Sequence, residues 1–545
     1  MKKAYLSLVS VMLLAGAAGA SLSSCGNKTG AAIDLTVDTR GQEIQFWTGF
    51  GTTITSALET VLEEFTEETG IKVTHTGQGG YDNLQAAING SASSITYPNV
   101  AVGYPDHFAG YIDSDIQERL DDFIAQDKNI PETREALEGY PVGNDGKFHE
   151  LPAFNIDDFD PAYMVENRSL EYDESGNPYT MGIPFNKSTE VMVYNRSFFE
   201  LEGVKAAGIA LPTTWAEAST QSQKILSYLN TNKVLPSKDA TGKKTVAGQI
   251  LASDGKVYAS ASAMEAAAKE AKTTYFPVLD ATKLTVGEFR PMSYDSQANF
   301  FITGVRQWGG TYSHVDKTTR RGYIDFQKGT ATREFLTAVN DLYQEGGIGI
   351  PQTWGEAAYC STPFKNYKSL MNIGSSAGVT NSIGSTVKFT VDCAPIPYHR
   401  EDKKYVISQG TNLAIFDIGT TAQKAASWKL VKYLSQIKNG LFAALTGYYP
   451  TCGTALNSED YQDFINHPVS DNDKINAAAA KVNTDIYSTA DTTWEKFVDP
   501  GFNGSSAIRT DIGTITAEIF IDNAGVASTI EKHVNSLSSY VEGNN

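Results

Sequence analysis

The stretch "GIPFNKSTEVMVYNRSFF", residues 182–199, combines a chain break, a polar patch and a strand. Gly182-Ile183-Pro184 interrupts regular structure, and the small polar side chains of residues 186–189 follow. Residues 191–194, "VMVY", are a short apolar run typical of a buried strand. Two explanations remain open at this point. The chain crosses here from one packed unit to another, or a plain polar turn precedes a strand.

Composition and charge describe a globular chain that is strongly acidic. Its 545 residues are 41% hydrophobic and 20% charged, which gives ample length for more than one core. Priors on domain size predict two to four domains. The formal net charge of −19 argues against nucleic acid or an anionic lipid surface as the binding partner.

The first residues have the features of a bacterial secretion signal. Lys2-Lys3 is followed by an apolar, small-residue segment over residues 4–20 and then by "LSSC" at 22–25. The cysteine after the expected cut resembles the lipobox of bacterial lipoproteins, although a signal cut elsewhere beside an incidental cysteine fits the same residues. We predict a signal peptide at 1–24, lipidation of Cys25 and a tether over 25–40. No later stretch reaches the ~20 apolar residues of a membrane helix, so the expected location is the cell surface or periplasm, lipid-anchored to the membrane.

Cysteine usage gives no indication of a metal site. After an acylated Cys25, only Cys360, Cys393 and Cys452 remain, so at most one disulfide forms. No CxxC pair and no Cys/His spacing typical of zinc is present in the sequence. We therefore expect neither a metal nor a cofactor.

The N-terminal region of the folded chain predicts alternating strands and helices. Residues 43–47 alternate as a strand, and a helix follows in which Ser56 and Glu59 form a capping box and Gly70 supplies the stop. Further strands are expected at 71–73 and 99–102, with a helix entered through "GGYDNLQAAI" between them. This order predicts a parallel sheet, and ligands gather at the carboxyl ends of such strands. The side chains just beyond predicted strand ends are Trp47, Tyr81, Tyr104 and Asp106.

The later elements are predicted more coarsely. A capped helix starts at Thr214-Trp215 and runs to about residue 229. Residues 230–290 are polar, carry an Ala-rich helix at 262–272 and are interpreted as an insertion. Further helices are expected around 335–343 and at 430–434, a strand at 406–416, and mostly helix over the last 80 residues.

Several segments in the same order resemble a known family. "IQFWTGF", "ETVLEEFTEETGIKV", "GGYDNLQAAI" and "NVAVGYPDH" are similar to the N-terminal lobe of bacterial extracellular solute-binding proteins of family 1, the maltose-binding and glycerol-3-phosphate-binding type. "GIPFNKSTEVMVYNRSFF", "LPTTWAEASTQSQKI", "FKNYKSLMNIGSSAG", "GTNLAIF" and "LTGYYPTCGTA" continue the resemblance over about residues 41–540.

The resemblance implies an α/β, two-lobe periplasmic-binding-protein-like fold (type II), with discontinuous lobes joined by a hinge. Lobe 1 would comprise 41–183 and 398–455, and lobe 2 would comprise 184–397 and 456–545. The polar patch at 186–189 would then face the cleft between the lobes. Hinge closure around a ligand and delivery to the permease subunits of an ABC importer are the implied mechanism. The protein would be a monomer without catalytic residues.

The resemblance also supplies candidate ligand-binding residues. Those that match family positions are Tyr81, Asp106, Ser188, Ser375, Ser376, Gly410, Tyr448 and Arg509. Each has an ordinary structural alternative: Tyr81 packs on its own lobe, Asp106 caps a helix, and Arg509 forms a salt bridge. Trp47, Trp308 and Trp354 are candidate sugar platforms, since an aromatic face stacks on the apolar face of a pyranose, but each is also a candidate core residue.

One departure from the family pattern concerns the ligand. Where the glycerol-3-phosphate branch has tryptophans, this chain has Ser296 and Asn299. The expected function is therefore capture of a carbohydrate, a sugar or oligosaccharide, with glycerol-3-phosphate or a glycerophosphodiester as the alternative ligand on the same fold.

An enzymatic alternative comes from "GSSAG", residues 374–378, which fits G-x-S-x-G. In a secreted serine hydrolase Ser376 would be the nucleophile, with Asp392 and either His399 or His467 completing a triad. A surface adhesin without a small ligand is a third class. A hydroxylated ligand that closes the molecule would separate the solute-binding hypothesis from both.

Overall fold

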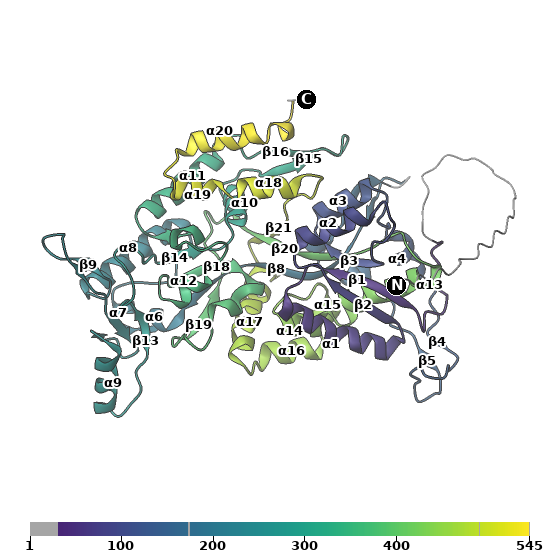
Figure 1. Ribbon diagram of the computed structural model, residues 1–545, viewed down its shortest axis with the longest axis horizontal. Coiled ribbons are helices and arrows are strands. Elements are labelled where there is room, and N and C mark those ends of the chain that lie inside the picture. The colour runs from purple at the N-terminus through teal and green to yellow at the C-terminus, as the bar shows by residue number, and fades with distance from the viewer. Residues whose placement is uncertain (1–30, 173–174, 490, 544–545) are drawn as a thin grey trace, which may run out of the picture.

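The computed structural model describes residues 31–172, 175–489 and 491–543. It shows two lobes side by side along the long axis of the molecule (Figure 1). The predicted signal peptide, residues 1–24, and the predicted lipidation site, Cys25, lie outside the described residues.

The first lobe opens with the predicted alternation of strands and helices. The elements, in order, are β1 (Glu43–Thr48), α1 (Thr52–Thr69), β2 (Lys72–Gly77), α2 (Tyr81–Ser91), β3 (Val100–Gly103) and α3 (Pro105–Asp113). β1 pairs in parallel with both β2 and β3, which confirms the predicted parallel sheet. The carboxyl ends of these strands therefore meet at one edge, and α2 and α3 start there.

One predicted helix boundary is wrong. α1 begins at Thr52, four residues before the expected capping box at Ser56, and its N-cap is Gly51 without a side-chain cap. The backbone closes the first turn instead, because Thr55 N donates to Gly51 O at 3.0 Å. The predicted stop is confirmed: Gly70 takes a left-handed conformation, with φ 69°, and its N–H donates to Thr66 O.

A large central sheet links the lobes through two long strands. Its order is β17-β14-β18-β8-β20-β3-β1-β2, with β19 added to β8 and β21 to β20. The strands not yet bounded are β8 (Ile183–Asn195), β14 (Met292–Tyr294), β17 (Ile348–Gly349), β18 (Met371–Ser375), β19 (Val391–Ala394), β20 (Lys404–Ile415) and β21 (Trp494–Phe497). β8 pairs with β20 over 183–189 and with β18 over 190–194, so the quoted stretch passes from one half of the sheet to the other.

Two hydrophobic cores lie on either side of these strands. One core draws its buried residues from 35–185 and 413–455, and the other from 191–407 and 475–537. A small third cluster around Tyr449 and Tyr461 lies where the chain returns between them. The polar patch of residues 186–189 separates the two cores along β8, and all four side chains are buried.

Helices cover the first lobe and continue into the return crossing. They are α4 (Asp121–Asp127), α5 (Pro161–Val165), α13 (Thr421–Lys432), α14 (Asn439–Thr446), α15 (Gly453–Leu456), α16 (Glu459–Asn466) and α17 (Asp471–Val482). A π-helical turn, η4 (Tyr433–Ile437), follows α13. α16 packs on α14 of the first lobe, whereas α17 packs on β19 and on the turn η3 (Ser376–Ser382) of the second.

The second lobe is mostly helical on its outer side. Its main helices are α6 (Arg196–Glu200), α7 (Glu202–Ala206), α8 (Trp215–Thr231), α10 (Gln297–Gln307), α11 (Ala331–Gln344), α12 (Ser361–Lys365), α18 (Ser505–Ile512), α19 (Ile515–Phe520) and α20 (Val526–Ser536). The cap predicted for α8 is confirmed, since Thr214 Oγ1 accepts from Glu217 N at 3.1 Å. A hairpin of β15 (Ser313–Val315) and β16 (Gly322–Ile324) lies near α20 (Figure 1).

Residues 230–290 form small elements at the outer end of the second lobe (Figure 1). They are β9 (Ser237–Lys238), β10 (Thr245–Val246), β11 (Ile250–Ala252), β12 (Val257–Tyr258), α9 (Ala261–Glu270) and β13 (Pro277–Asp280). β11 pairs with β12 and β13, and Leu251 and Leu279 join the core of the lobe.

The described part of the predicted tether, residues 31–40, packs against the first lobe. Leu35 is buried, and Lys429 Nζ donates to Thr39 Oγ1 at 2.7 Å. Arg134, on β4 (Thr133–Arg134), donates to two carbonyls of the same segment. This part of the segment therefore belongs to the folded lobe.

Candidate ligand-binding cleft

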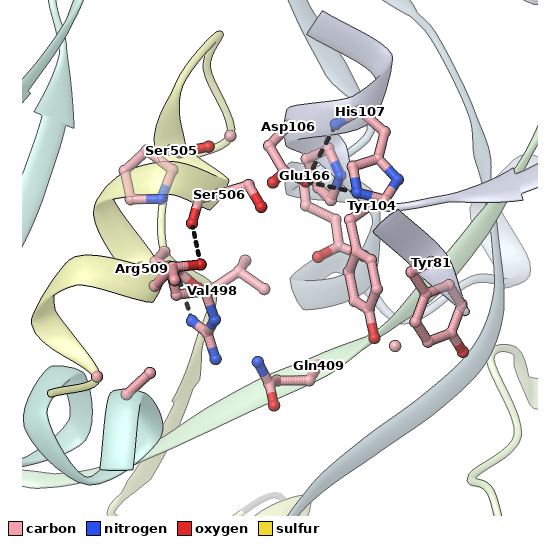
Figure 2. A pocket seen from close by; sticks show the side chains of 18 of the residues that line it. Tyr81, Tyr104, Asp106, His107, Glu166, Gln409, Val498, Ser505, Ser506 and Arg509 are labelled. Carbon is pink, nitrogen blue, oxygen red and sulfur yellow. Dashed lines mark hydrogen bonds and ion pairs between the residues drawn. The ribbon is translucent and has the colours of Figure 1, made fainter. Parts of the chain in front are cut away.

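A cavity of about 460 Å³ lies between the lobes, beside the crossing strands. Figure 2 shows its two walls: α3 with Asp106 and Tyr104 on one side, and α18 with Arg509 on the other, with Gln409 of β20 between them. The lining residues from the first lobe are Tyr81, Asp82, Tyr104, Pro105, Asp106, His107 and Glu166.

The first-lobe wall is built where two parallel strands end. Tyr81 is the first residue of α2, and Tyr104 is the N-cap residue of α3, with Pro105 in the first helical position. The two rings are half-buried and meet edge to face, with centroids 5.0 Å apart. Both rings line the cavity and offer aromatic surface to a ligand.

Asp106 is the carboxylate of this wall. Its Oδ1 accepts from His107 N at 3.0 Å and lies 4.0 Å from His107 Nε2. Burial lowers the pKa of His107, which favours the uncharged imidazole, and burial raises the pKa of Asp106. Among the described residues, no Lys or Arg forms an ion pair with Asp106.

The second-lobe wall is held by an arginine with fixed partners. Arg509 donates to Asp499 Oδ2 at 2.9 Å and also donates to Asn299 Oδ1. Asn299 in turn donates to Gln409 Oε1 at 2.8 Å. Burial acts to lower the pKa of Arg509, but the charge and hydrogen bond of Asp499 together with the nearby Tyr312 and Tyr104 raise the pKa above its ordinary value. The guanidinium is therefore charged and fixed in place.

The floor of the cavity is the crossing of β8 and β20. Gly410 has φ 123°, and a Cβ there would lie 1.9 Å from Asn186 O, so only glycine fits. Beneath it Lys187 donates to Gly410 O at 3.2 Å and forms an ion pair with Glu166. Burial lowers the pKa of Lys187 and raises that of Glu166.

Four of the predicted site residues line this cavity: Tyr81, Asp106, Gly410 and Arg509. The others lie outside its lining. Ser188 is buried in the β8–β20 pairing opposite Gln409. Trp47 packs half-buried on the first core, and Tyr448 is buried with its ring parallel to Phe442 at 6.3 Å.

The remaining predicted residues belong to the second lobe. Trp308 stacks on His399 with ring centroids 4.0 Å apart, and Trp354 Nε1 donates to Glu288 O. Ser375 is exposed and accepts from Ala377 N at the start of η3. Ser376 is buried beside it.

Most lining residues were absent from the predicted site, among them the polar side chains of Tyr104, Glu166, Gln409 and Asp499. Tyr104 had a usable signal, because it directly follows a predicted strand in the parallel sheet. The other three lie in segments with no local pattern that indicates a ligand site.

The position of Ser376 does not suit a nucleophile. Its side chain is fully buried, and its Oγ accepts from Thr189 N at 3.2 Å. His399 stacks on Trp308, and His467 lies 3.0 Å from Asp463 on the surface. The contacts of the described residues bring neither histidine to Ser376.

The described residues contain neither a cluster of metal ligands nor a disulfide. No group of three or more His, Cys, Asp or Glu side chains among them is placed to hold a metal ion. Cys360, Cys393 and Cys452 are free thiols. Within the described part of the chain, no helix combines the length and apolar character needed to cross a bilayer.

Comparison with known families gives one match over most of the chain. A model described as bacterial extracellular solute-binding protein matches residues 60–469. No curated protein sequence matches the chain.

Solved structures with the same fold align over nearly the whole molecule. The GacH receptor of Streptomyces glaucescens, solved unliganded and with acarbose, has a TM-score of 0.58 at 14% identity, over 92% of this chain and 99% of its own. UgpB from Mycobacterium tuberculosis with glycerophosphocholine has a TM-score of 0.60 at 13% identity, over 92% and 98%. The sugar-binding protein MalE from Xanthomonas citri has a TM-score of 0.59 at 15% identity, over 92% and 97%. These similarities confirm the expected two-lobe α/β fold.

Proposed function

The chain belongs to the bacterial extracellular solute-binding protein family, and from that premise we propose that it captures a carbohydrate in the interlobe cavity and delivers it to the permease of an ABC importer. The observation that carries the proposal is the convergence of aromatic and hydrogen-bonding side chains from both lobes on one cavity. Tyr81 and Tyr104 offer ring surface to a pyranose. Asp106, Gln409 and Arg509 offer acceptors and donors to its hydroxyls.

The charges of the cavity favour a sugar over a phosphorylated ligand. Arg509 is the one basic Lys or Arg side chain among the residues that line the cavity, and its charge is already paired with Asp499. Glu166 is paired with Lys187, and the two remaining acidic groups, Asp82 and Asp106, would repel a phosphate. Glycerol-3-phosphate or a glycerophosphodiester is therefore the weaker candidate, even though UgpB was solved with glycerophosphocholine.

Contacts between the lobes support a mechanism of hinge closure. Gly501 of the second lobe packs so closely on Pro105 that a Cβ there would lie 2.4 Å from the Pro105 Cβ. Lys496 Nζ also lies 2.8 Å from Asp160 Oδ2 across the lobes. We propose that β8 and β20 act as the hinge and that breaking these contacts opens the cavity.

The proposed lobe boundaries are those expected from the sequence, 41–183 with 398–455 and 184–397 with 456–545. Membership of the two cores supports them with two exceptions: Tyr405, Val406 and Ile407 pack in the core of the second lobe, and α16 packs on the first lobe. We place the return crossing between α16 and α17 for this reason.

We also propose that the protein is held at the membrane by acylation of Cys25. The support is the sequence: a basic start, a short apolar segment and a cysteine after small residues. In cells fed a labelled fatty acid, the full chain should carry label and sediment with membranes. A Cys25→Ser variant that keeps both the label and the membrane fraction would contradict acylation at this residue.

The binding proposal is tested by a thermal-shift and calorimetric screen of mono- and oligosaccharides beside glycerol phosphates. A ligand at a hundred times its dissociation constant stabilises the fold by about 2.7 kcal/mol, an easily measured shift. Tyr81→Ala should abolish the response. Asp122→Asn, at an exposed acid on α4 that does not line the cavity, is the control. Stabilisation by glycerol phosphates alone would favour the alternative ligand, and a sugar recovered chemically altered would favour an enzyme.

A further inference from the structure

The cavity between the lobes has an imbalance of charge that its own residues do not correct. Four carboxylates line it, from Asp82, Asp106, Glu166 and Asp499, beside the single guanidinium of Arg509. Glu166 is paired with Lys187, and Asp499 is paired with Arg509. Two carboxylates therefore remain without a cationic side chain among the described residues.

Of these two, Asp106 is the one placed to meet a ligand. Asp82 is exposed, whereas the Asp106 side chain is 18% exposed and lies on the wall that faces α18 (Figure 2). Its nearest ionisable neighbour is His107, which is 2% exposed and held toward its uncharged form. Asp499 on the opposite wall is paired with Arg509, so the one guanidinium of the cavity is already engaged.

A neutral ligand would leave this charge uncompensated when the lobes close. Sugar hydroxyls donate hydrogen bonds to a carboxylate but carry no charge, so a desolvated Asp106 would remain a buried anion. The burial that raises its pKa already shows that the ionised form lacks full compensation. An ammonium group on the ligand would supply the missing charge and a stronger, charge-assisted hydrogen bond.

The aromatic side chains beside Asp106 suit the same group. Tyr104 is two residues away and lies next to Asp106 in the cavity, with Tyr81 against its ring (Figure 2). An ammonium within about 6 Å of a tyrosine ring face is attracted to it as well as to the carboxylate. The overall charge of −19 adds a long-range field that attracts cations into the cleft.

We propose that the carbohydrate captured here carries a protonated amino group. Asp106 accepts a hydrogen bond from this group, and the ring of Tyr104 lies beside it. This inference rests on the proposed function, since it names the class of sugar bound in the same cavity. It makes Asp106 a specificity residue that separates aminated sugars from their hydroxylated counterparts.

The test uses pairs of sugars that differ in one group. The full-length mature chain is titrated by calorimetry at neutral pH with glucosamine against glucose, galactosamine against galactose, and the glucosamine disaccharide against cellobiose. The N-acetylated sugars serve as bulky but uncharged controls. In at least one pair the aminated sugar should bind about tenfold or more tightly than its neutral partner, a difference of about 1.4 kcal/mol. Raising the salt concentration should reduce that ratio.

Two variants assign the effect to one residue. Asp106→Asn keeps the shape of the side chain and removes its charge, so the ratio of aminated to neutral affinity should fall toward one. Asp122→Asn removes an equal charge from the surface of the same lobe and should leave the ratio unchanged. An unchanged ratio in Asp106→Asn overturns the role of Asp106.

The outcomes separate this inference from the proposed function. If neutral sugars bind and their aminated partners bind no more tightly, the amino-group proposal fails and carbohydrate capture stands. If no sugar of the panel binds, both fail.

Discussion

The two walls of the cavity are built in different ways. The first-lobe wall is local: Tyr81, Tyr104 and Asp106 stand at helix starts shortly after β2 and β3, the two strands that flank β1. The second-lobe wall is assembled over long distances, since Arg509 reaches Asn299, 210 residues away in the sequence. The local wall carries an unpaired carboxylate, and the assembled wall carries an arginine already neutralised. The difference suggests that the second lobe supplies a pre-organised surface and the first lobe supplies the charge that selects the ligand.

The floor that joins the walls should produce the largest effect when broken. Lys187→Met leaves Glu166, whose side chain is 5% exposed, as a buried charge without a cation. Removal of one partner of a buried pair costs about 3–5 kcal/mol, and urea unfolding should show a loss of this size. Adding Glu166→Gln removes the stranded charge and should recover much of the loss.

A partly exposed pair provides the control for this loss. Lys438 pairs with Glu64 at 2.6 Å, and its side chain is 25% exposed. Lys438→Met should cost only about 1 kcal/mol or less, because water screens such pairs. Equal losses of unfolding free energy in Lys187→Met and Lys438→Met would show that the buried Lys187–Glu166 pair matters no more for stability than the partly exposed pair does.

A buried carboxyl behind the second wall should make the stability of the protein depend on pH. Burial raises the pKa of Glu190 to about 7, while Tyr294 donates a hydrogen bond to its Oε2 at 2.6 Å and its Oε1 has no partner. Because the folded-state pKa is raised above the unfolded value, the protonated form is favoured in the fold. Its contribution to stability is complete below about pH 4.5 and is lost as the pH rises through about 7.

The expected loss is about 3 kcal/mol, from a shift of roughly two and a half pKa units. Glu190→Gln replaces the carboxyl by an amide of the same shape that does not titrate. The unfolding free energy of this variant should therefore change less with pH over this range than that of the wild type. The comparison is made between the two proteins over pH 4.5–8, so that contributions of other groups cancel. Identical slopes would contradict a raised pKa at Glu190.

Ligand binding should weaken when the planar guanidinium of Arg509 on the second-lobe wall is replaced by an ammonium group. Arg509→Lys keeps the charge, but an ammonium cannot hold Asp499 and Asn299 with the planar geometry of the guanidinium. The affinity for the best sugar of the screen should fall about tenfold, or about 1.4 kcal/mol. Arg196→Lys, in an exposed pair with Glu200, is the matched control and should bind as the wild type does.

The contrast between the walls also explains what the sequence could predict. Alternating strands and helices set the parallel sheet, and a parallel sheet brings residues after its strands to one edge, so Tyr81 and Asp106 were within reach of local pattern. The start of α1 was missed because a backbone bond to Gly51, rather than the Ser56 side chain, closes its first turn. The cavity position of Tyr81 and Asp106 and the start of α1 were both inferred from residues close in sequence. The second inference failed because the actual N-cap, Gly51, has no side chain that the sequence pattern could identify.

The second wall could not be derived in that way. Arg509 was found through family resemblance alone, and its partners Asn299 and Asp499 come from a different helix and a loop. Ser188 is a different case. It pairs opposite Gln409, which lines the cavity, but the Ser188 side chain is buried and outside the lining. Its contact with a ligand stays a prediction, because what covers a side chain depends on packing that local sequence does not fix.

The smallest effect is expected at a tryptophan that the resemblance placed in the site. Trp308 stacks on His399 at 4.0 Å and packs on Phe335, outside the cavity lining. Trp308→Phe keeps an aromatic ring in this cluster, so the sugar affinity should stay within about twofold of the wild type, or about 0.4 kcal/mol. Tyr104→Phe, which changes one polar atom on the first wall, should lower the affinity by more than that in the same titration. If Trp308→Phe weakens binding more than Tyr104→Phe does, the ligand extends beyond the two walls toward α10, and the carbohydrate is longer than this cavity holds.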